Sequence, residues 1–382
     1  NQALFAHEWI FMGIEAKSLA YIFIFWALYK LFKNKNYHAI IFTALATYFH
    51  VLVGGWFLIY LIFFLLLEKQ VLTKIIKSGL LFLIITLPFI IFLVPTYIND
   101  TETTINGINT NWIYAYYRNA HHLAPFESFH KFYHYFFPGI LITIVLYSLC
   151  IFLFSKIENM QFRKLNNLNI AIFSFQLLFV IISFFDKNGA LLKYYPFRSS
   201  ALSLFLILIE FALYIKINHG FIGKTRWITI SRLKSVILLV SFILVSFYTI
   251  NSTLSAISYH KEYKNRDVQV IAEFFKKNTD KEDVILSFVE NDEMLPLLRK
   301  SERKLFVLFK FVPTTSELLY QWYTRNELSK QVKSNHDLIV DVCSQYQVNY
   351  VVSDDKINSR YYKELLSSQR YFVYEVQCPA QK

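Results

Sequence analysis

Charged residues are scarce in this 382-residue chain, in which they make up 17% of the positions, against roughly 25% in soluble domains. Hydrophobic residues account for 55%, with 39 Phe and 26 Tyr, and the mean hydropathy is +0.36. A soluble globule of this size does not need so much apolar surface. The composition therefore predicts an integral membrane protein.

Several motifs are also missing. No signal peptide is visible, and the chain starts Asn-Gln without Met, so we expect a processed chain or a fragment that lacks an N-terminal helix. Cysteine occurs only three times. Cys150 lies in an apolar run and is expected in the core, whereas Cys343 and Cys378 either pair in an oxidising compartment or stay as two thiols.

The net charge of +12 is unevenly distributed along the chain. Residues 258–382 carry a net charge of +1, and residues 1–257 carry the remaining +11. A basic excess can indicate nucleic-acid binding, but here it belongs to loops between apolar runs. We therefore expect no nucleic-acid partner.

Hydrophobic runs of nearly 20 residues predict membrane-spanning helices. About seven to eight spans are expected, and in the paired run a short helix bends at His50, Gly54 and Gly55 before it returns. The candidate spans are 18–33, 38–50 with 51–67, 78–95, 138–155, 169–185, 199–217 and 235–257.

The positive-inside rule orients these spans. With residues 1–17 outside, the inside loops hold 14 Lys and Arg and the outside segments before residue 258 hold six. This orientation places 96–137, 186–198 and 258–382 outside. For a bacterial inner membrane, the C-terminal domain would lie in the periplasm.

From about residue 258 the pattern changes to short alternating helices and strands. Helices are expected at 267–278, 293–299, 313–332 and 336–346, and strands at 283–289, 304–309, 349–353 and 371–376. The sequence thus predicts a transmembrane domain, 1–257, and a small soluble α/β domain, 258–382. The soluble domain has no Gly-rich phosphate loop and no metal-ligand spacing, so we interpret it as a lid or docking domain.

Polar residues with chemical potential gather on the predicted outer side. Glu8 and Glu15 precede the first span, where Lys17 could pair with Glu15 as ordinary interfacial charge. The 42-residue loop 96–137 contains Arg118, His121 and His122. Its aromatic residues fit an interfacial belt, but Arg beside two His also suits a phosphate group.

A second cationic group lies between two later spans. Lys193, Tyr195 and Arg198 surround a Pro-containing aromatic turn, which is compatible with side chains that reach the interface and equally with an anion pocket. Glu210 lies within a span, where a carboxylate is costly. The sequence leaves open whether it is a protonated helix contact or lines a cavity.

The order of these motifs resembles the GT-C superfamily of membrane glycosyltransferases. The resemblance is carried by Gly-Ile-Glu-Ala-Lys-Ser-Leu-Ala-Tyr at 13–21 and the run ending Val-Gly-Gly-Trp at 44–56, similar to the second outer acidic motif of the oligosaccharyltransferase catalytic subunit. The Arg-x-x-His-His-Leu-x-Pro loop, the Tyr-Pro-Phe-Arg turn and Lys310–Arg325 are similar to an uncharacterised bacterial family of GT-C-like proteins.

The resemblance implies an inverting transfer of a sugar from a polyprenyl-phosphate donor to an acceptor outside the membrane. It implies Glu15 or Glu8 as the acidic residue that acts as base or orients the acceptor. It implies that cations on the outer loops hold the donor phosphate, with these residues binding the substrate: Arg118, His121, His122, Lys193, Tyr195 and Arg198.

The chain also departs from the superfamily. It has no Asp-x-Asp, and the Trp-Trp-Asp acceptor motif is missing from residues 258–382, so sequon glycosylation is not expected. No metal ligands are assigned, the need for a divalent metal stays open, and no protein partner is indicated. Two alternatives remain: a non-catalytic membrane scaffold of an envelope-glycan or secretion assembly, and a lipid-linked-glycan polymerase or ligase. A transporter is disfavoured, because no internal repeat is evident.

Overall fold

The computed structural model describes residues 3–6, 8–11, 15–98, 103–219, 266–289 and 291–378, with a few single positions between 243 and 254. The chain divides into two compact units. The first contains residues 1–101 and 114–256, and the second contains residues 102–113 and 257–382. The division between the units falls after residue 256, beside the predicted boundary at 257, and a piece of the loop 96–137 belongs to the C-terminal unit.

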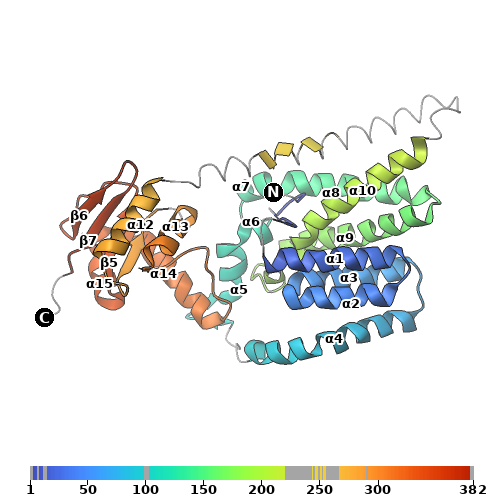
Figure 1. Cartoon of the computed structure of the whole chain (residues 1–382), viewed down its shortest axis with the longest axis horizontal. Helices are drawn as coiled ribbons and strands as arrows, with labels where there is room; N and C mark the ends of the chain where they lie inside the picture. The colour runs from blue at the N-terminus through green and yellow to red at the C-terminus, as the bar shows by residue number, and fades with distance from the viewer. Residues whose placement is uncertain are drawn as a thin grey trace. The chain divides into compact units, whose positions relative to one another are not determined.

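The first unit is a bundle of helices that run side by side (Figure 1). Apolar residues cover much of every helix, and the buried ones form two adjoining clusters between the helices. The long helices are α1 (Ala16–Phe32), α2 (Asn36–Phe49), α3 (Val51–Leu67), α4 (Leu72–Ile98), α8 (Phe137–Phe152), α9 (Met160–Phe185) and α10 (Ser200–His219).

Four helical segments in the described part of the chain are long and apolar enough to cross a membrane. They are Leu72–Leu93, Phe129–Lys156, Met160–Phe185 and Leu192–Ile217, and they contain or overlap four of the predicted spans. Helices α1, α2 and α3 have 17, 14 and 17 residues, fewer than the about 20 that a perpendicular span needs. The protein is thus a helical membrane protein, while seven to eight spans stay a prediction; the expected span 235–257 falls almost wholly outside the described residues.

The predicted break in the paired run is confirmed at His50. Helix α2 ends at Phe49 and α3 begins at Val51, and the His50 Nδ1 atom lies 3.4 Å from the Val53 amide nitrogen. The two helices then pack very closely. A Cβ atom on Gly54 would lie 2.2 Å from the Thr47 Oγ1 atom and 2.6 Å from the Thr47 backbone nitrogen.

An N-terminal segment, residues 3–6, packs into the bundle rather than lying on it. Its side chains are buried, and the Phe5 carbonyl accepts a hydrogen bond from the Ser200 hydroxyl at 2.8 Å. Gly139 on α8 leaves the space for it, since a Cβ there would lie 2.1 Å from the Leu4 carbonyl oxygen. This packing fixes the start of the segment that carries Glu8.

The loop between α4 and α8 contains short elements: α5 (Thr110–Trp112), the π-helix η1 (Ile113–Arg118), α6 (Ala120–Leu123), α7 (Phe129–Lys131) and the π-helix η2 (Phe132–Phe136). Short 3-10 helices follow α8 and α9, namely η3 (Phe154–Lys156), η4 (Leu192–Tyr194) and η5 (Pro196–Ser199). π-helical turns occur frequently at functional sites, and here they flank the predicted Arg-His-His motif.

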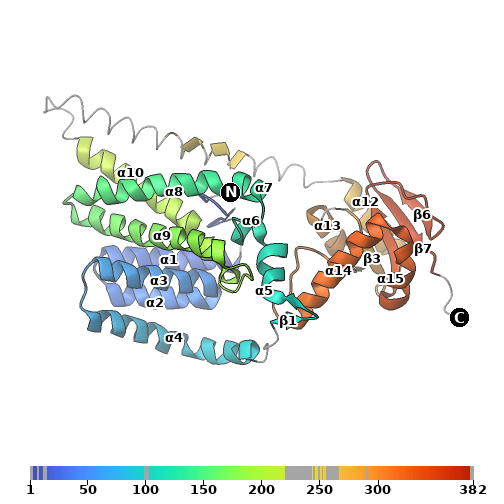
Figure 2. The same cartoon turned by 180° about the vertical axis from the view of Figure 1, so that it is seen from behind.

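The second unit is a small α/β domain with a five-stranded mixed sheet (Figure 2). The strand order is β4-β3-β5-β7-β6, with β3 parallel to β4 and β5 and the remaining pairs antiparallel. The strands are β3 (Val284–Ser287), β4 (Lys304–Leu305), β5 (Val348–Ser353), β6 (Tyr362–Ser367) and β7 (Phe372–Val376).

Helices cover both faces of this sheet, because alternate strand residues point to opposite sides. Ile285 and Val352 pack with α12 (Arg266–Asn278) and α13 (Asn291–Ser301), whereas Leu286 and Val351 pack with α14 (Ser316–Ser334) and α15 (Ile339–Tyr346). The 3-10 helix η6 (His336–Leu338) precedes α15. The predicted helices are confirmed, but the sequence missed strand β6, and β4 is shorter than predicted.

Residues 102–113 join this unit through a hairpin of β1 (Thr104–Ile105) and β2 (Ile108–Asn109) that packs on α14. The Asn106 amide donates to the Tyr320 hydroxyl at 3.1 Å, and the Thr110 and Ser316 hydroxyls lie 3.2 Å apart. A disulfide links Cys343 to Cys378 and Cys150 is a buried thiol, which decides between the two predicted cysteine states.

Candidate functional site

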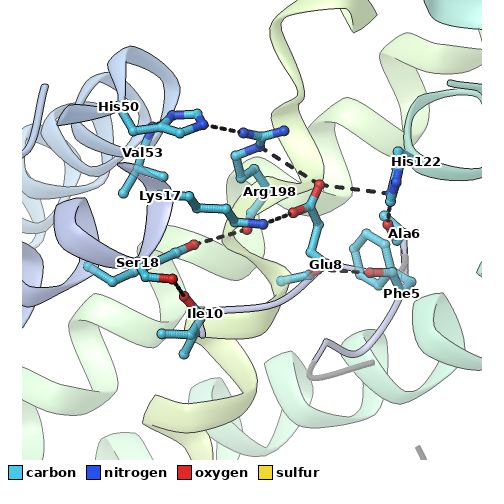
Figure 3. A network of polar contacts seen from close by, with 12 residues as sticks. Phe5, Ala6, Glu8, Ile10, Lys17, Ser18, His50, Val53, His122 and Arg198 are labelled. Atoms are coloured by element: carbon cyan, nitrogen blue, oxygen red, sulfur yellow. Dashed lines mark hydrogen bonds and ion pairs between the residues drawn. The ribbon is translucent and has the colours of Figure 1, made fainter. Parts of the chain in front are cut away.

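A buried carboxylate, Glu8, lies at the centre of a polar network in the helical unit (Figure 3). Its side chain is 2% exposed. The Lys17 ammonium lies 2.5 Å from its Oε2 atom, while the Arg198 Nε and His122 Nδ1 atoms lie 3.8 Å and 3.9 Å from its Oε1 atom. Three separate stretches of sequence thus bring nitrogen donors to one carboxylate.

Lys17 comes from the first turn of α1 and has the shortest contact with Glu8. Its ammonium also lies 4.0 Å from the centroid of the Trp9 ring, a distance at which a cation is attracted to an aromatic face. Burial lowers the pKa of Lys17 from its ordinary value, and the neighbouring Glu8 carboxylate acts in the opposite direction. The ion pair with Glu8 therefore opposes the loss of charge that burial favours at Lys17.

Arg198 is held from three sides. Its guanidinium donates a hydrogen bond of 2.6 Å to the His50 Nε2 atom and lies 4.3 Å from the centroid of the Tyr195 ring. Its carbonyl accepts a 3.3 Å hydrogen bond from the Tyr21 hydroxyl. Tyr195 has a positive φ of 53°, an uncommon conformation for a bulky residue, and this turn begins the 3-10 helix that presents Arg198.

His50 accepts the hydrogen bond from the Arg198 guanidinium. Burial and, second, the Arg198 charge lower the pKa of His50 to about 4. The imidazole is therefore neutral at pH 7, and its Nε2 atom can accept a hydrogen bond from the guanidinium. Its other nitrogen, Nδ1, lies 3.4 Å from the Val53 amide nitrogen at the start of α3. Because a neutral imidazole has only one acceptor nitrogen, the shorter contact with Arg198 takes it.

His122 reaches the network from the loop helix α6. Its Nδ1 atom is hydrogen-bonded to the Ala6 carbonyl, which fixes Nδ1 as the protonated nitrogen because a carbonyl oxygen only accepts. The rings of His121 and Tyr195 lie 4.1 Å and 6.3 Å from the His122 ring. The N-terminal segment, α6 and the Tyr195 turn are therefore interlocked around Glu8.

A second hydrogen-bonded layer lies beneath Arg198. The hydroxyls of Tyr60 and Ser199 lie 2.7 Å apart, and the Gln176 amide donates to Ser199 and Ser203, both at 3.2 Å. A small cavity of about 10 Å³ borders this layer, lined mainly by apolar and aromatic side chains together with Arg198 and Ser199. A cavity of this size holds about one water molecule.

The structure separates the predicted site residues into two groups. Glu8, His122, Tyr195 and Arg198 meet in the network. Glu15 is exposed at the residue before α1, and Lys17 forms its ion pair with Glu8 instead of the expected Glu15. Of the two predicted acidic residues, the cations therefore gather around Glu8 and not around Glu15.

The remaining predicted residues lie on α6 or on the neighbouring elements η1 and η4. His121 adjoins His122, Lys193 lies with its ammonium 5.3 Å from the centroid of the Tyr194 ring, and Arg118 is half-buried at the end of η1. The sequence missed His50 as a member of the site. The available signal was its position at the break of a long apolar run.

Within the residues that the structure describes, no group of three or more His, Cys, Asp or Glu side chains is arranged to hold a metal ion. No family model, no curated protein and no solved structure matches this chain. Function is therefore argued from the geometry of the site.

Proposed function

We propose that the protein is a membrane glycosyltransferase of the GT-C type that transfers a sugar from a polyprenyl-phosphate donor to an acceptor hydroxyl. One observation carries the proposal: a single buried carboxylate, Glu8, is surrounded by Lys17, Arg198 and His122. The two formal positive charges exceed the one negative charge, so the network has spare positive charge for an anionic ligand.

The chemistry requires both signs of charge in one place. In the proposed reaction Glu8 takes the proton of the acceptor hydroxyl, whose oxygen forms the new bond to the sugar C1 atom. The bond from C1 to the phosphate oxygen breaks, and the phosphate leaves with the electron pair. A positioned base and fixed cations each lower such a barrier, and Lys17 and Arg198 are placed to stabilise the leaving phosphate.

The cellular setting follows from the same proposal. The donor is a membrane lipid, and four apolar helical segments provide the surrounding bilayer-spanning part. The Cys343–Cys378 disulfide supports a C-terminal domain in an oxidising compartment. We therefore place the protein in the cell envelope, in a bacterial inner membrane with this domain in the periplasm.

A second candidate is the non-catalytic scaffold, and the burial of Glu8 favours it. A carboxylate that is 2% exposed must become accessible before an acceptor can reach it. In the scaffold the network would only hold the N-terminal segment, α1, α6 and the Tyr195 turn together. The two candidates differ in what happens when the charges are removed without loss of folding.

A transfer assay separates them. Purified protein in lipid is incubated with radiolabelled polyprenyl-phosphate sugars and cell-envelope acceptors, and wild type is compared with Arg198→Ala and with Arg163→Ala, an exposed arginine at the start of α9. We expect transfer by wild type and Arg163→Ala and a loss of about a hundredfold or more for Arg198→Ala. No turnover with any donor would leave the scaffold as the explanation.

A further inference from the structure

Two histidines outside the Glu8 network form a separate side-chain pair. The ring centroids of His130 and His134 lie 4.4 Å apart. Both side chains are exposed. They lie in the helical segment Phe129–Lys156, ahead of the predicted span 138–155. His130 is in α7 and His134 is in the π-helix η2, and the short distance between their rings places both on one face of this segment.

Side-chain contacts hold the backbone that carries this pair. The Ser128 hydroxyl caps the segment by accepting a hydrogen bond from the Lys131 amide at 3.3 Å, and Lys131 pairs with Glu127 at 3.1 Å. A neighbouring stripe of aromatic rings, Phe129, Tyr133 and Phe137, stacks along the helix with centroid distances of 6.3 Å and 6.1 Å. The helical backbone that carries the two imidazoles is therefore already ordered before a ligand binds.

We propose that His130 and His134 form a binding site for a zinc-class divalent metal ion. Imidazole nitrogens are preferred ligands of zinc, copper and nickel, and two His at i and i+4 on a helix are the spacing used in helical zinc sites. Two protein ligands leave coordination positions for water or an anionic ligand, which is typical of an exchangeable ion and not of a closed structural site.

This site is independent of the proposed glycosyl transfer and makes its own chemical predictions. Zn²⁺ binds to the pair, whereas Mg²⁺, which prefers oxygen ligands, does not. Because the metal and protons compete for the same imidazole nitrogens, acidification weakens Zn²⁺ binding.

The test is calorimetric titration of the purified full chain with Zn²⁺ alone and with Mg²⁺ alone. His130→Ala and His134→Ala are each expected to weaken Zn²⁺ binding more than tenfold. His38→Ala, which removes an exposed histidine from the first turns of α2, should bind Zn²⁺ like wild type.

A thermal melt with and without Zn²⁺ provides the second readout. Wild type should gain a higher unfolding midpoint from Zn²⁺, and the two alanine variants should lose that gain while melting normally without metal. If a variant fails to fold, His134→Gln replaces it. Equal Zn²⁺ binding by wild type and both alanine variants, or no Zn²⁺ binding by wild type, would overturn the proposal.

Discussion

At the scale of single residues, the buried charges around Glu8 compensate one another. A carboxylate buried in an apolar bundle is costly unless cations and hydrogen bonds compensate it. Lys17, at 2.5 Å, provides most of that compensation, and Arg198 contacts the other carboxylate oxygen at 3.8 Å. Removing one charge should therefore be worse than removing both.

The first prediction concerns this pair. Lys17→Met should lower the free energy of unfolding by about 3 kcal/mol, the lower end for a broken buried pair, because Arg198 still lies near Glu8. The double variant Glu8→Gln with Lys17→Met should recover much of the loss. Thermal unfolding in detergent measures both. A double variant less stable than Lys17→Met would show that the pair is not the compensating interaction.

The second prediction concerns pH and His50. Its folded-state pKa of about 4 lies below the ordinary value of about 6.5, so the unfolded chain binds more protons between these values. Stability from neutral His50 is full above pH 6.5 and is lost as the pH falls towards 4. His50→Asn keeps an acceptor that does not titrate. Its unfolding midpoint should fall less than that of wild type between pH 7 and pH 4.5, and equal falls would exclude this role.

At the scale of the helices and strands, close packing of α2 on α3 sets the position of His50. Gly54 faces the Thr47 backbone, whereas a Cβ at the adjacent Gly55 would have no atom within 4 Å. The two glycines are neighbours on the same helix and therefore serve as test and control. The close approach of α2 and α3 requires Gly54 but does not require Gly55.

The third prediction uses this pair. Gly54→Ala should destabilise the protein by about 1–3 kcal/mol, because the new methyl overpacks a contact with backbone atoms that cannot rotate away. Gly55→Ala should be neutral or stabilise by up to about 1 kcal/mol, since Ala is the better helix former. Comparison of the two melting temperatures measures the difference. If both variants behave alike, α2 and α3 do not pack as described.

The elements also show what the sequence could predict. Long apolar runs identified the main spans, and the break at His50 was visible because polar and glycine residues interrupt a run that is too long for one helix. Strand β6, Tyr-Lys-Glu-Leu-Leu-Ser, was missed because it lies at the sheet edge and is largely exposed. Its charged residues lack the period-2 pattern that identifies strands.

The site shows a different limit. Sequence distance hides that Glu8, His122 and Arg198 meet, since each lies in a different segment of the bundle. Local reasoning paired Lys17 with Glu15, its neighbour two positions away, because residues close in sequence are the only pairs a pattern can show. Side chains at i and i+2 do not face each other on a helix, so that pairing had little geometric support.

At the scale of the whole molecule, the chain consists of a helical membrane unit and an α/β unit. Residues 102–113, which end at the first residue of the π-helix η1, belong to the α/β unit through contacts with α14. The α/β unit is thus continuous in sequence with the loop that carries His122. The Cys343–Cys378 bridge ties the chain after β7 to α15.

The fourth prediction concerns the bridge. Without reductant, thiol labelling of unfolded protein should modify Cys150 alone, and reduction should expose all three cysteines. The Cys343→Ser with Cys378→Ser variant should lose about 2–4 kcal/mol from the C-terminal unit, because the cross-link closes a loop of 35 residues. Labelling of all three cysteines in protein isolated without reductant would contradict the bridge and its support for an oxidising compartment.

We propose Glu8 as the proton acceptor in sugar transfer. The most direct measurement is the turnover number for transfer from a radiolabelled polyprenyl-phosphate sugar by Glu8→Gln, beside Glu127→Gln, which removes a carboxylate from a partly exposed ion pair on the loop before α7. We expect a fall of about 10²–10⁴-fold for Glu8→Gln and wild-type turnover for Glu127→Gln. Undiminished turnover by a folded Glu8→Gln variant would contradict this proposal.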